Sequence, residues 1–295
     1  MAARILDGKS LAADLRAEVA AAVAEWQAAT GRAPGLAVVL VGDDPASRSY
    51  VTAKEKACAA AGIRSREIQL PASAAKADVL AAVRALNADD AVDGILVQLP
   101  LPEAAIEREV IEAVDPAKDV DGFHPTNVGR MVLGLPAFVP CTPAGVVELL
   151  RRAGVALAGA SVVVIGRSQI VGRPLSILLS QKGVDATVTL CHTRTRDVAR
   201  FTREADVVVV AAGRPRTLTA DMVKPGAVVI DVGVNRVPDP SKPTGYRLAG
   251  DADFAAVAEK AAAITPVPGG VGPLTIAMLL KNTLEAARRR RGVGA

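Results

Sequence analysis

The segment Val162–Pro174, "VVVIGRSQIVGRP", has the pattern of a buried strand, a tight turn and the start of a helix. Four successive β-branched residues are typical of a strand covered on both faces, and Gly166 permits a sharp turn directly after it. The dinucleotide fingerprint G-x-G-x-x-G would require glycines at 166, 168 and 171, whereas this chain has Ser168, Val171 and a glycine at 172. The turn and the amides of the helix start can still meet a phosphate. A cofactor loop and a plain strand–helix turn both stay open at this point.

Similar apolar runs alternate with helical patterns along the whole chain. Short, continuously apolar runs predict strands at 36–41, 94–97, 161–166, 186–191, 206–211 and 226–231. Amphipathic patterns predict helices at 11–29, 47–61, 79–87, 143–153, 172–182 and 273–290. This alternation predicts βαβ units and parallel sheets, which is an α/β fold.

An irregular stretch rich in Pro, Gly and Asp, residues 115–143, marks the expected domain boundary. We therefore predict an N-terminal α/β domain over 1–142 and a Rossmann-type domain with a parallel sheet over 143–272. The long terminal helix, 273–291, is expected to pack back on the N-terminal domain. Ligands of such sheets bind outside the carboxyl ends of the strands, so a cleft between the two sheets is the expected site.

Composition excludes several other classes of protein. The chain of 295 residues is 51% hydrophobic with a net charge of +4, and part of that excess is the terminal run Arg288–Arg291, expected to be solvated and to complement the helix dipole. Basic stripes with interleaved aromatic residues are missing, which argues against nucleic-acid binding. Three cysteines without a C-x-x-C pair indicate neither a disulfide framework nor a zinc site, and no metal is expected. No apolar run approaches the ~18 residues of a membrane span, so a cytoplasmic protein is expected.

The strand after the turn runs into "CHTRTRD", residues 191–197, where the first carboxylate is Asp197. Folds selective for NAD carry an acid at the end of this strand to hold the ribose hydroxyls. Here the chain offers Thr193, Arg194 and Arg196, with Arg167 in the preceding turn, and such groups suit a 2′-phosphate. We therefore predict NADP as the cofactor. Solvated surface arginines are the alternative.

The stretch "SYVTAKEKACAAAGI", 49–63, places Tyr50 and Lys54 on one side of a predicted helix, because they are four residues apart. A lysine among apolar groups and other cations loses its proton more easily and can act as a general base. A surface lysine whose chain lies along the helix is the alternative. Lys56 points away from this side.

Three further segments end strands or begin helices. In "DGILVQLPLP" a buried strand ends at Gln98, whose amide could orient a water or tie down its own loop. In "DPAKDVDGFHP" the spacing of the acids fails the calcium-loop pattern, so Asp121 is either a ligand for an amide or amidine edge or part of an Asx-turn. The loop "PVPGGVGP", 266–273, could line a flat ring or only join two domains.

Taken together and in this order, these motifs resemble the FolD family of bifunctional methylenetetrahydrofolate dehydrogenases/methenyltetrahydrofolate cyclohydrolases. The resemblance extends from "DGKSLA" through "YVTAKEKACAAAGI", "DGILVQLPLP", "KDVDGFHPTNVGR", "PCTPAGV", "GRSQIVGRP" and "DVGVNR" to "TPVPGGVGPLTIAMLLKNT", nearly the whole chain. It implies a folate cleft, a Rossmann NADP domain, and a homodimer joined through the cofactor domain. It also implies a role in one-carbon metabolism that serves purine and amino-acid biosynthesis.

The resemblance also implies roles for individual residues. Lys54 matches the catalytic lysine of the family, Gln98 its partner, Tyr50 the tyrosine beside the folate ring and Asp121 the aspartate that grips the pterin. The expected NADP contacts are Gly166, Arg167, Ser168, Thr193 and Val234, with Thr193 standing where the family commonly has serine. The expected substrate contacts are Tyr50, Gln98, Leu99, Pro100, Asp121, Pro268, Gly269 and Gly270.

The implied activity is the NADP-dependent oxidation of 5,10-methylenetetrahydrofolate, followed by hydrolysis of 5,10-methenyltetrahydrofolate to 10-formyltetrahydrofolate. Three alternatives share parts of this pattern: a dehydrogenase with little cyclohydrolase activity, an NADP-binding regulator without catalysis, and a two-domain amino-acid or shikimate-type dehydrogenase. The last would not explain "VQLPLP" or "PVPGGVGP".

Overall fold

The computed structural model describes residues 3–292 and divides the chain into two compact units. Unit 1 comprises Met1–Ala12 and Thr142–Thr275, and unit 2 comprises Ala13–Cys141 and Ile276–Ala295. All three boundaries fall inside continuous helices: α1 (Gly8–Thr30), α6 (Cys141–Arg152), of which only the first residue belongs to unit 2, and α10 (Gly272–Arg291). The start of the chain differs from the expected division, because β1 (Arg4–Ile5) pairs with β11 (Ala263–Ile264) in unit 1.

Unit 2 is built on a three-stranded parallel sheet in the order β3-β2-β4. Every residue of the central strand β2 (Gly35–Val41) and of β4 (Gly94–Val97) is buried, which is why both were recognisable as apolar runs. The edge strand β3 (Arg64–Leu70) has no counterpart among the strands predicted from the sequence. Its sequence "RSREIQL" is mostly polar, and none of its residues is fully buried.

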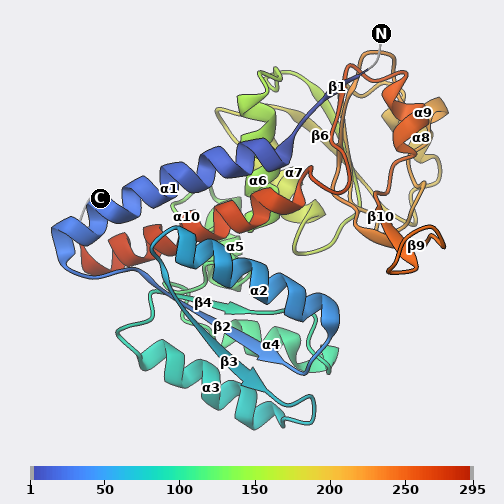
Figure 1. Cartoon of the computed structure of the whole chain (residues 1–295). Helices are drawn as coiled ribbons and strands as arrows, with labels where there is room; N and C mark the ends of the chain where they lie inside the picture. The colour runs from blue at the N-terminus through green and yellow to red at the C-terminus, as the bar shows by residue number, and fades with distance from the viewer. Residues whose placement is uncertain (1–2, 293–295) are drawn as a thin grey trace. The chain divides into compact units, whose positions relative to one another are not determined.

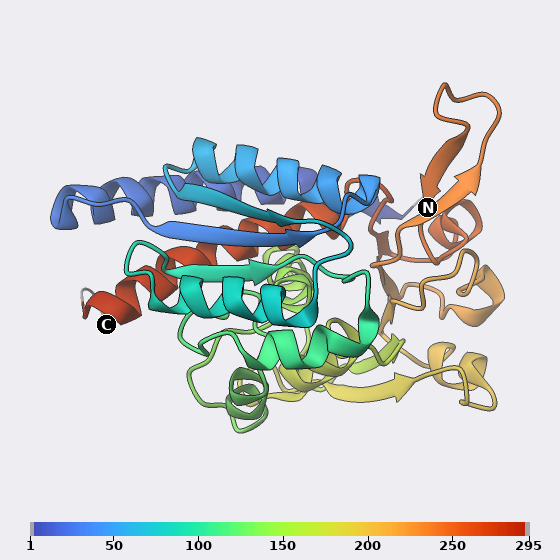
Figure 2. The same cartoon turned by 90° about the horizontal axis from the view of Figure 1, so that it is seen from below.

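Helices cover both faces of this sheet. Besides parts of α1 and α10, the helices of unit 2 are α2 (Pro45–Ala60), α3 (Lys76–Ala88), η1 (Ala104–Ile106), α4 (Glu107–Glu112) and α5 (Pro125–Val132). Figures 1 and 2 show α2 over one face, and α3 and α4 over the other. The start of α2 is well defined, because Pro45 opens the helix and the side chain of Asp44 accepts the Ser47 N–H at 2.8 Å.

The C-terminal helix α10 belongs to unit 2 from Ile276 onward, as the sequence predicted. Asn282 Nδ2 donates to the Val120 carbonyl at 2.8 Å. Arg290 donates to the Val92 carbonyl at 2.7 Å and to the fully buried Asp93 at 3.1 Å. The prediction that the terminal arginines are merely solvated is therefore wrong for Arg290, whose guanidinium fastens the helix end.

Unit 1 contains a six-stranded parallel sheet in the order β1-β11-β8-β7-β5-β6. Its longer strands are β5 (Ser161–Ile165), β6 (Thr187–Cys191), β7 (Val207–Val210) and β8 (Val228–Asp231). Its helices are α6 (Cys141–Arg152), α7 (Gly172–Ser180), α8 (Val198–Thr202), η2 (Ala220–Met222) and α9 (Phe254–Ala258). An antiparallel hairpin of β9 (Asn235–Pro238) and β10 (Tyr246–Ala249) completes it. The predicted Rossmann-type parallel sheet is confirmed.

None of the helices within residues 3–292 combines the length and apolarity needed to cross a membrane.

Candidate functional site

Lys54 lies on the buried side of α2, where it is only 9% exposed. The same side buries Ser47, Val51 and Cys58, so Lys54 occupies a position in the apolar stripe of the helix. Tyr50, one turn earlier, is 49% exposed. This burial argues against a surface lysine that extends along the helix.

Gln98 follows β4 directly and is held by the sheet, because its backbone N–H donates to the Val39 carbonyl at 2.9 Å. Its side-chain amide donates to the Leu99 carbonyl at 2.7 Å, which turns the amide oxygen toward α2. Lys54 Nζ donates to that oxygen at 3.0 Å. The fold therefore joins two predicted site residues that are 44 positions apart in the chain.

The three acids before α5 have different roles. Asp119 is buried and accepts the His124 N–H and the Asn127 side-chain amide, both at 2.8 Å. Asp115 accepts a backbone N–H two residues ahead, as in an Asx-turn. Asp121 makes neither kind of local turn contact among the described residues, so its carboxylate is the one available to a ligand.

Asp121 is partly buried, and this burial raises the pKa of its carboxyl to about 6. The charge of Lys54 acts in the opposite direction, which places these two side chains in one electrostatic neighbourhood. The Cys141 thiol donates to the Val120 carbonyl at 3.5 Å and lies close enough to Asp121 to favour its ionised form, and Asn282 Nδ2 lies 3.7 Å from the same sulfur. Sequence reasoning had not assigned Cys141 or Asn282 to the site, because no local spacing links them to Asp121.

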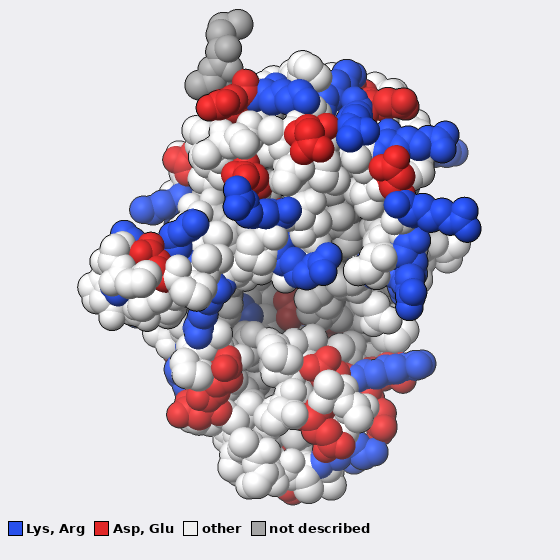
Figure 3. Space-filling view, turned by 90° about the vertical axis from the view of Figure 1, so that its right-hand side faces the viewer, with Lys and Arg blue, Asp and Glu red and all other residues white. Residues whose placement is uncertain are grey.

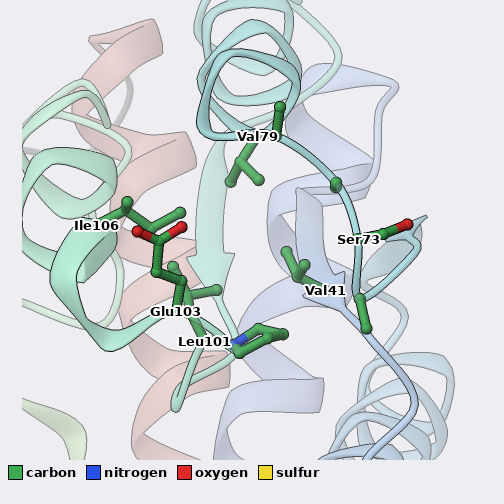
Figure 4. Close-up of a pocket in the computed structure, with 10 residues that line it drawn as sticks. Val41, Ser73, Val79, Leu101, Glu103 and Ile106 are labelled. Carbon is green, nitrogen blue, oxygen red and sulfur yellow. The ribbon is translucent and has the colours of Figure 1, made fainter.

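Unit 2 also contains a cavity of about 370 Å³ between the start of α3 and η1 (Figure 4). Its lining combines Val41, Val79, Leu101 and Ile106 of the core beneath α3 with the polar residues Ser73 and Glu103. None of the predicted site residues lines it. The cavity therefore extends the core packing and is separate from the Lys54–Gln98 pair.

In unit 1 the turn after β5 requires two glycines. A Cβ at Gly166, whose φ is +119°, would lie 2.1 Å from the Ala211 carbonyl oxygen. A Cβ at Gly172 would lie 1.9 Å from the Gly166 carbonyl oxygen. The tight turn therefore exists although the spacing departs from the common fingerprint, since Gly172 supplies the close approach.

Ser168 organises this turn from within. Its hydroxyl accepts the N–H groups of Val171 at 3.1 Å and Gly172 at 3.4 Å, and its carbonyl accepts the Arg173 N–H at 3.1 Å. The first amides of α7 are thus already bonded inside the loop, which differs from the expectation that they are free for a phosphate. The guanidinium of Arg167 has no protein partner among residues 3–292, so a cation remains available there.

The end of β6 is rich in free cations. Thr193, Arg194 and Arg196 are exposed, and the two guanidiniums have no partner among the described residues. The first carboxylate, Asp197, accepts the Arg200 N–H at the start of α8. Unit 1 has 18 Lys and Arg against 12 Asp and Glu, whereas unit 2 has 17 against 19. Lys and Arg side chains gather over the upper part of the face drawn in Figure 3.

Four of the remaining predicted contacts, Val234, Pro268, Gly269 and Gly270, lie in unit 1, whereas Leu99 and Pro100 follow Gln98 in unit 2 and are joined by a cis peptide bond. Val234 follows β8 and is 50% exposed. Pro268 follows a cis peptide bond, and Gly269 has φ +105°. A Cβ at Gly270 would lie 2.5 Å from the Pro266 carbonyl oxygen, so the loop before α10 depends on glycine at this position.

The sequence and the fold match one family of proteins. Residues 6–121 match the family model described as tetrahydrofolate dehydrogenase/cyclohydrolase, catalytic domain, and residues 140–291 match the NAD(P)-binding domain of the same family. The chain is 57% identical over 293 residues to the bifunctional protein FolD of Treponema pallidum, covering 99% of this chain and 93% of that relative.

Two solved structures are similar over almost their full lengths. The bifunctional FolD methylenetetrahydrofolate dehydrogenase/cyclohydrolase of Campylobacter jejuni has a TM-score of 0.92 at 46% identity, covering 98% of this chain and 100% of that one. The FolD of Trypanosoma brucei, solved with NADP and an inhibitor, has a TM-score of 0.94 at 42% identity and covers 99% of both chains. Because these similarities span both units, the chain belongs to the tetrahydrofolate dehydrogenase/cyclohydrolase family.

Proposed function

We infer that the chain is a bifunctional enzyme of one-carbon folate metabolism. It oxidises 5,10-methylenetetrahydrofolate to 5,10-methenyltetrahydrofolate with NADP⁺ and hydrolyses that product to 10-formyltetrahydrofolate. The observation that carries this inference is the hydrogen bond between Lys54 and Gln98 near Asp121, within the segment that matches the catalytic domain of the family.

The first reaction requires a hydride acceptor, which NADP⁺ supplies when bound. The turn at Gly166 and Gly172 packs tightly on its own backbone, because a Cβ at either position would collide with a carbonyl oxygen, and a turn of this kind between a strand and a helix is proposed to receive the pyrophosphate. Thr193 offers a hydroxyl, and Arg167 a free guanidinium, to the 2′-phosphate. Ser168 supports the turn, and Val234 is proposed to contact the nicotinamide half. Hydride loss leaves a methenyl cation on the folate, so this step needs orientation of the substrate more than a proton acceptor.

The second reaction adds water to that cation. Gln98 accepts from Lys54 and so holds the amine in place, and we assign Lys54 as the base that takes a proton from the attacking water. The C–O bond forms as Lys54 takes one proton of the water. The bond between the bridge carbon and one folate nitrogen then breaks, the second proton of the water passes to that nitrogen, and the added oxygen becomes the formyl carbonyl. The product carries the formyl group on the other nitrogen.

The remaining folate contacts are proposed from the chemistry of each side chain. The carboxylate of Asp121 suits the amidine edge of the pterin, since it can accept two parallel N–H bonds. Tyr50 is proposed to stack against the ring, which its 49% exposure allows. Leu99 and Pro100 next to Gln98, and the backbone at Pro268, Gly269 and Gly270, complete the proposed folate contacts.

The deciding experiment follows both steps with the purified chain, using the absorbance of NADPH and of methenyltetrahydrofolate. Lys54→Ala is expected to lower the cyclohydrolase rate by at least about 10²-fold, because a positioned general base contributes about 10²–10⁴-fold. Lys56→Ala is the matched control, since Lys56 lies two residues further along the same helix and is exposed. The control should hydrolyse methenyltetrahydrofolate at the wild-type rate.

Each rival predicts a different result in this assay. Hydrolysis at the wild-type rate in Lys54→Ala would refute the assignment of the base. NADPH formation without any hydrolysis in the wild-type chain would show a monofunctional dehydrogenase. Binding of NADP⁺ without turnover of either substrate would show a regulator.

The preference for NADP⁺ is tested in the same assay with both cofactors. The free cations at the end of β6 and the engaged Asp197 favour a higher kcat/KM with NADP⁺ than with NAD⁺. A pair of charge-assisted contacts to the 2′-phosphate is expected to give at least about a tenfold ratio. A preference for NAD⁺ would refute the assignment of Thr193 and Arg167.

The biological setting follows from the family. We propose a cytoplasmic homodimer whose product serves purine and amino-acid biosynthesis. Light scattering should then give twice the chain mass of 30.2 kDa. Fractionation of cells, and the nutrient requirements of cells that lack the chain, test the other two statements.

A further inference from the structure

Two buried carboxylates in unit 1 have no part in the chemistry described above. Asp231 is the last residue of β8 and is 2% exposed, and Asp251, just beyond β10, is fully buried. Neither forms an ion pair with a Lys or Arg among residues 3–292. Buried charges without a counterion are costly, so the groups that satisfy them indicate what they do.

Asp251 binds the loop that follows β7. Its Oδ2 accepts the backbone N–H groups of Ala212 at 2.6 Å and Gly213 at 2.8 Å. Its Oδ1 accepts a hydrogen bond from the side-chain amide of Asn235 at 2.8 Å. Asn235 follows Val234 directly and begins β9. One carboxylate thus holds the two loops at the carboxyl ends of β7 and β8.

Asp231 binds the loop that follows its own strand and the segment that carries Asp251. Its Oδ1 accepts the N–H groups of Gly233 at 3.0 Å and Asp251 at 2.9 Å, and its Oδ2 accepts that of Ala252 at 2.8 Å. Its backbone N–H donates to the Thr265 hydroxyl at 2.7 Å. Burial, with a contribution from the neighbouring Asp251, raises the pKa of Asp231 to about 6.

The glycines around the pair show how closely the loops approach it. A Cβ at Gly233 would lie 2.2 Å from the carboxyl carbon of Asp251. A Cβ at Gly250 would lie 1.9 Å from Asp231 Oδ2. The loops are therefore shaped to bring their backbone onto these two carboxylates.

The order of strands shows which part of a dinucleotide meets these loops. β5, with the Gly166 turn, lies between β6 on one side and β7 and β8 on the other. A dinucleotide whose pyrophosphate lies at β5 and whose 2′-phosphate lies at the cationic end of β6 extends its other half across β7 and β8. That half carries the nicotinamide.

We propose that Asp231 and Asp251 are positioning residues of the dehydrogenase reaction, which fix the loops after β7 and β8 against the nicotinamide half of NADP. This inference rests on the proposed function. An ionised carboxylate only accepts hydrogen bonds, and here five backbone N–H groups and one side-chain amide converge on the pair. Bonds of this charge-assisted kind hold a loop more firmly than neutral ones.

The test replaces one carboxylate oxygen of Asp251 by an NH₂ group, which turns a hydrogen-bond acceptor into a donor and keeps the shape of the side chain. In Asp251→Asn the new NH₂ group must face either the two backbone N–H groups or the Asn235 amide. The expected result is at least about a tenfold rise in KM for NADP⁺ or an equal fall in the dehydrogenase kcat, since a factor of ten corresponds to about one lost hydrogen bond to a charged group. Cyclohydrolase activity on supplied methenyltetrahydrofolate should stay within about twofold of wild type, because Lys54 and Gln98 lie in unit 2.

Adenosine 2′,5′-bisphosphate separates positioning from general damage to the fold. This probe carries the 2′-phosphate half of NADP without the nicotinamide, so its affinity for Asp251→Asn, measured by calorimetry, should equal that for wild type. Asp231→Asn should behave in the same way. Asp221→Asn, with a carboxylate of unit 1 whose side chain is 75% exposed, is the matched control and should be unchanged in every assay.

Unchanged NADP⁺ kinetics in both Asn variants would overturn the inference. The inference would also be overturned if the affinity for the bisphosphate probe, or the cyclohydrolase activity, fell together with the NADP⁺ kinetics. The carboxylates would then support the fold of the whole unit. Absence of NADPH formation in the wild-type chain is a separate result, and it would refute the proposed function itself.

Discussion

In the ligand-free folded chain, the ionised form of Asp121 is destabilised relative to its protonated form. Its pKa is raised to about 6 by burial, above the value of about 4 in an unfolded chain. The folded state therefore binds the proton more tightly, and this group lowers the free energy of unfolding above pH 6. The penalty disappears as the pH falls from 6 toward 4.

Asp121→Asn should therefore stabilise the ligand-free chain at pH 7.5 while it abolishes folate turnover. Two pH units correspond to about 3 kcal/mol, and partial contact with solvent and the loss of the Lys54 attraction reduce the gain to about 1–2 kcal/mol. Urea unfolding followed by the fluorescence of Trp26, the single tryptophan and a core residue of unit 2, measures it. The gain should vanish near pH 4.5.

The exposed Asp14 on α1 offers a control for this measurement. Asp14→Asn changes the net charge equally and should leave the midpoint unchanged at both pH values. A destabilised Asp121→Asn variant at pH 7.5 would show that the carboxylate supports the apo fold, contrary to the electrostatic argument.

For single residues, the sequence was enough to identify Lys54 as a site residue but not to identify every residue near it. Helical spacing places Lys54 in the stripe of Val51 and Cys58, so its burial follows from the periodicity of α2. Its bond to Gln98 depends on how α2 packs on the sheet, which no local pattern contains. Cys141 is twenty positions from Asp121 in the chain, and only the closed fold brings the thiol to the carboxylate.

Among the elements, α10 shows how a terminal helix can be essential to a sheet that is distant in sequence. Arg290 is 18% exposed, and its guanidinium meets the fully buried Asp93, which Arg32 also contacts at 2.8 Å. Removal of one guanidinium leaves a buried carboxylate with a single cation.

Arg290→Ala is expected to lower the free energy of unfolding of unit 2 by about 2–3 kcal/mol, less than for a buried pair without a second cation. Urea unfolding monitored by Trp26 fluorescence measures it. Arg288→Ala is the matched control, because Arg288 has no ion pair or hydrogen bond through its guanidinium among the described residues. Equal midpoints for the two variants would contradict the role given to Arg290.

The elements themselves were predictable to different extents. The buried strands β2, β4, β5, β7 and β8 have continuous apolar runs, because helices cover both faces of their sheets. The edge strand β3 lacks such a run, and β1 and β11 have only two residues each. The hairpin of β9 and β10 has mixed polar composition and partial exposure, so its pairing had no signal in the sequence.

Across the whole molecule, the alternation of strands and helices was enough to predict two α/β units with a Rossmann-type sheet. The position of the N-terminal segment was not predictable, because β1 is short and its partner β11 is more than 250 residues away. Nor could the turn at Gly172 be recognised by a fixed glycine spacing, since the requirement is the approach of its backbone to the Gly166 carbonyl.

The discontinuity of unit 2 has a consequence for how the chain is made. Residues 13–141 are synthesised before residues 142–275, but Asn282 and Arg290, which bind the Val120 and Val92 carbonyls, follow these partners in the chain by 162 and 198 positions. The sheet of unit 2 must therefore wait, without its terminal helix, while the whole of residues 142–275 is synthesised. Until α10 has been made, the Val120 and Val92 carbonyls and Asp93 lack the hydrogen bonds that Asn282 and Arg290 supply, so unit 2 is completed only once the chain has reached Arg290.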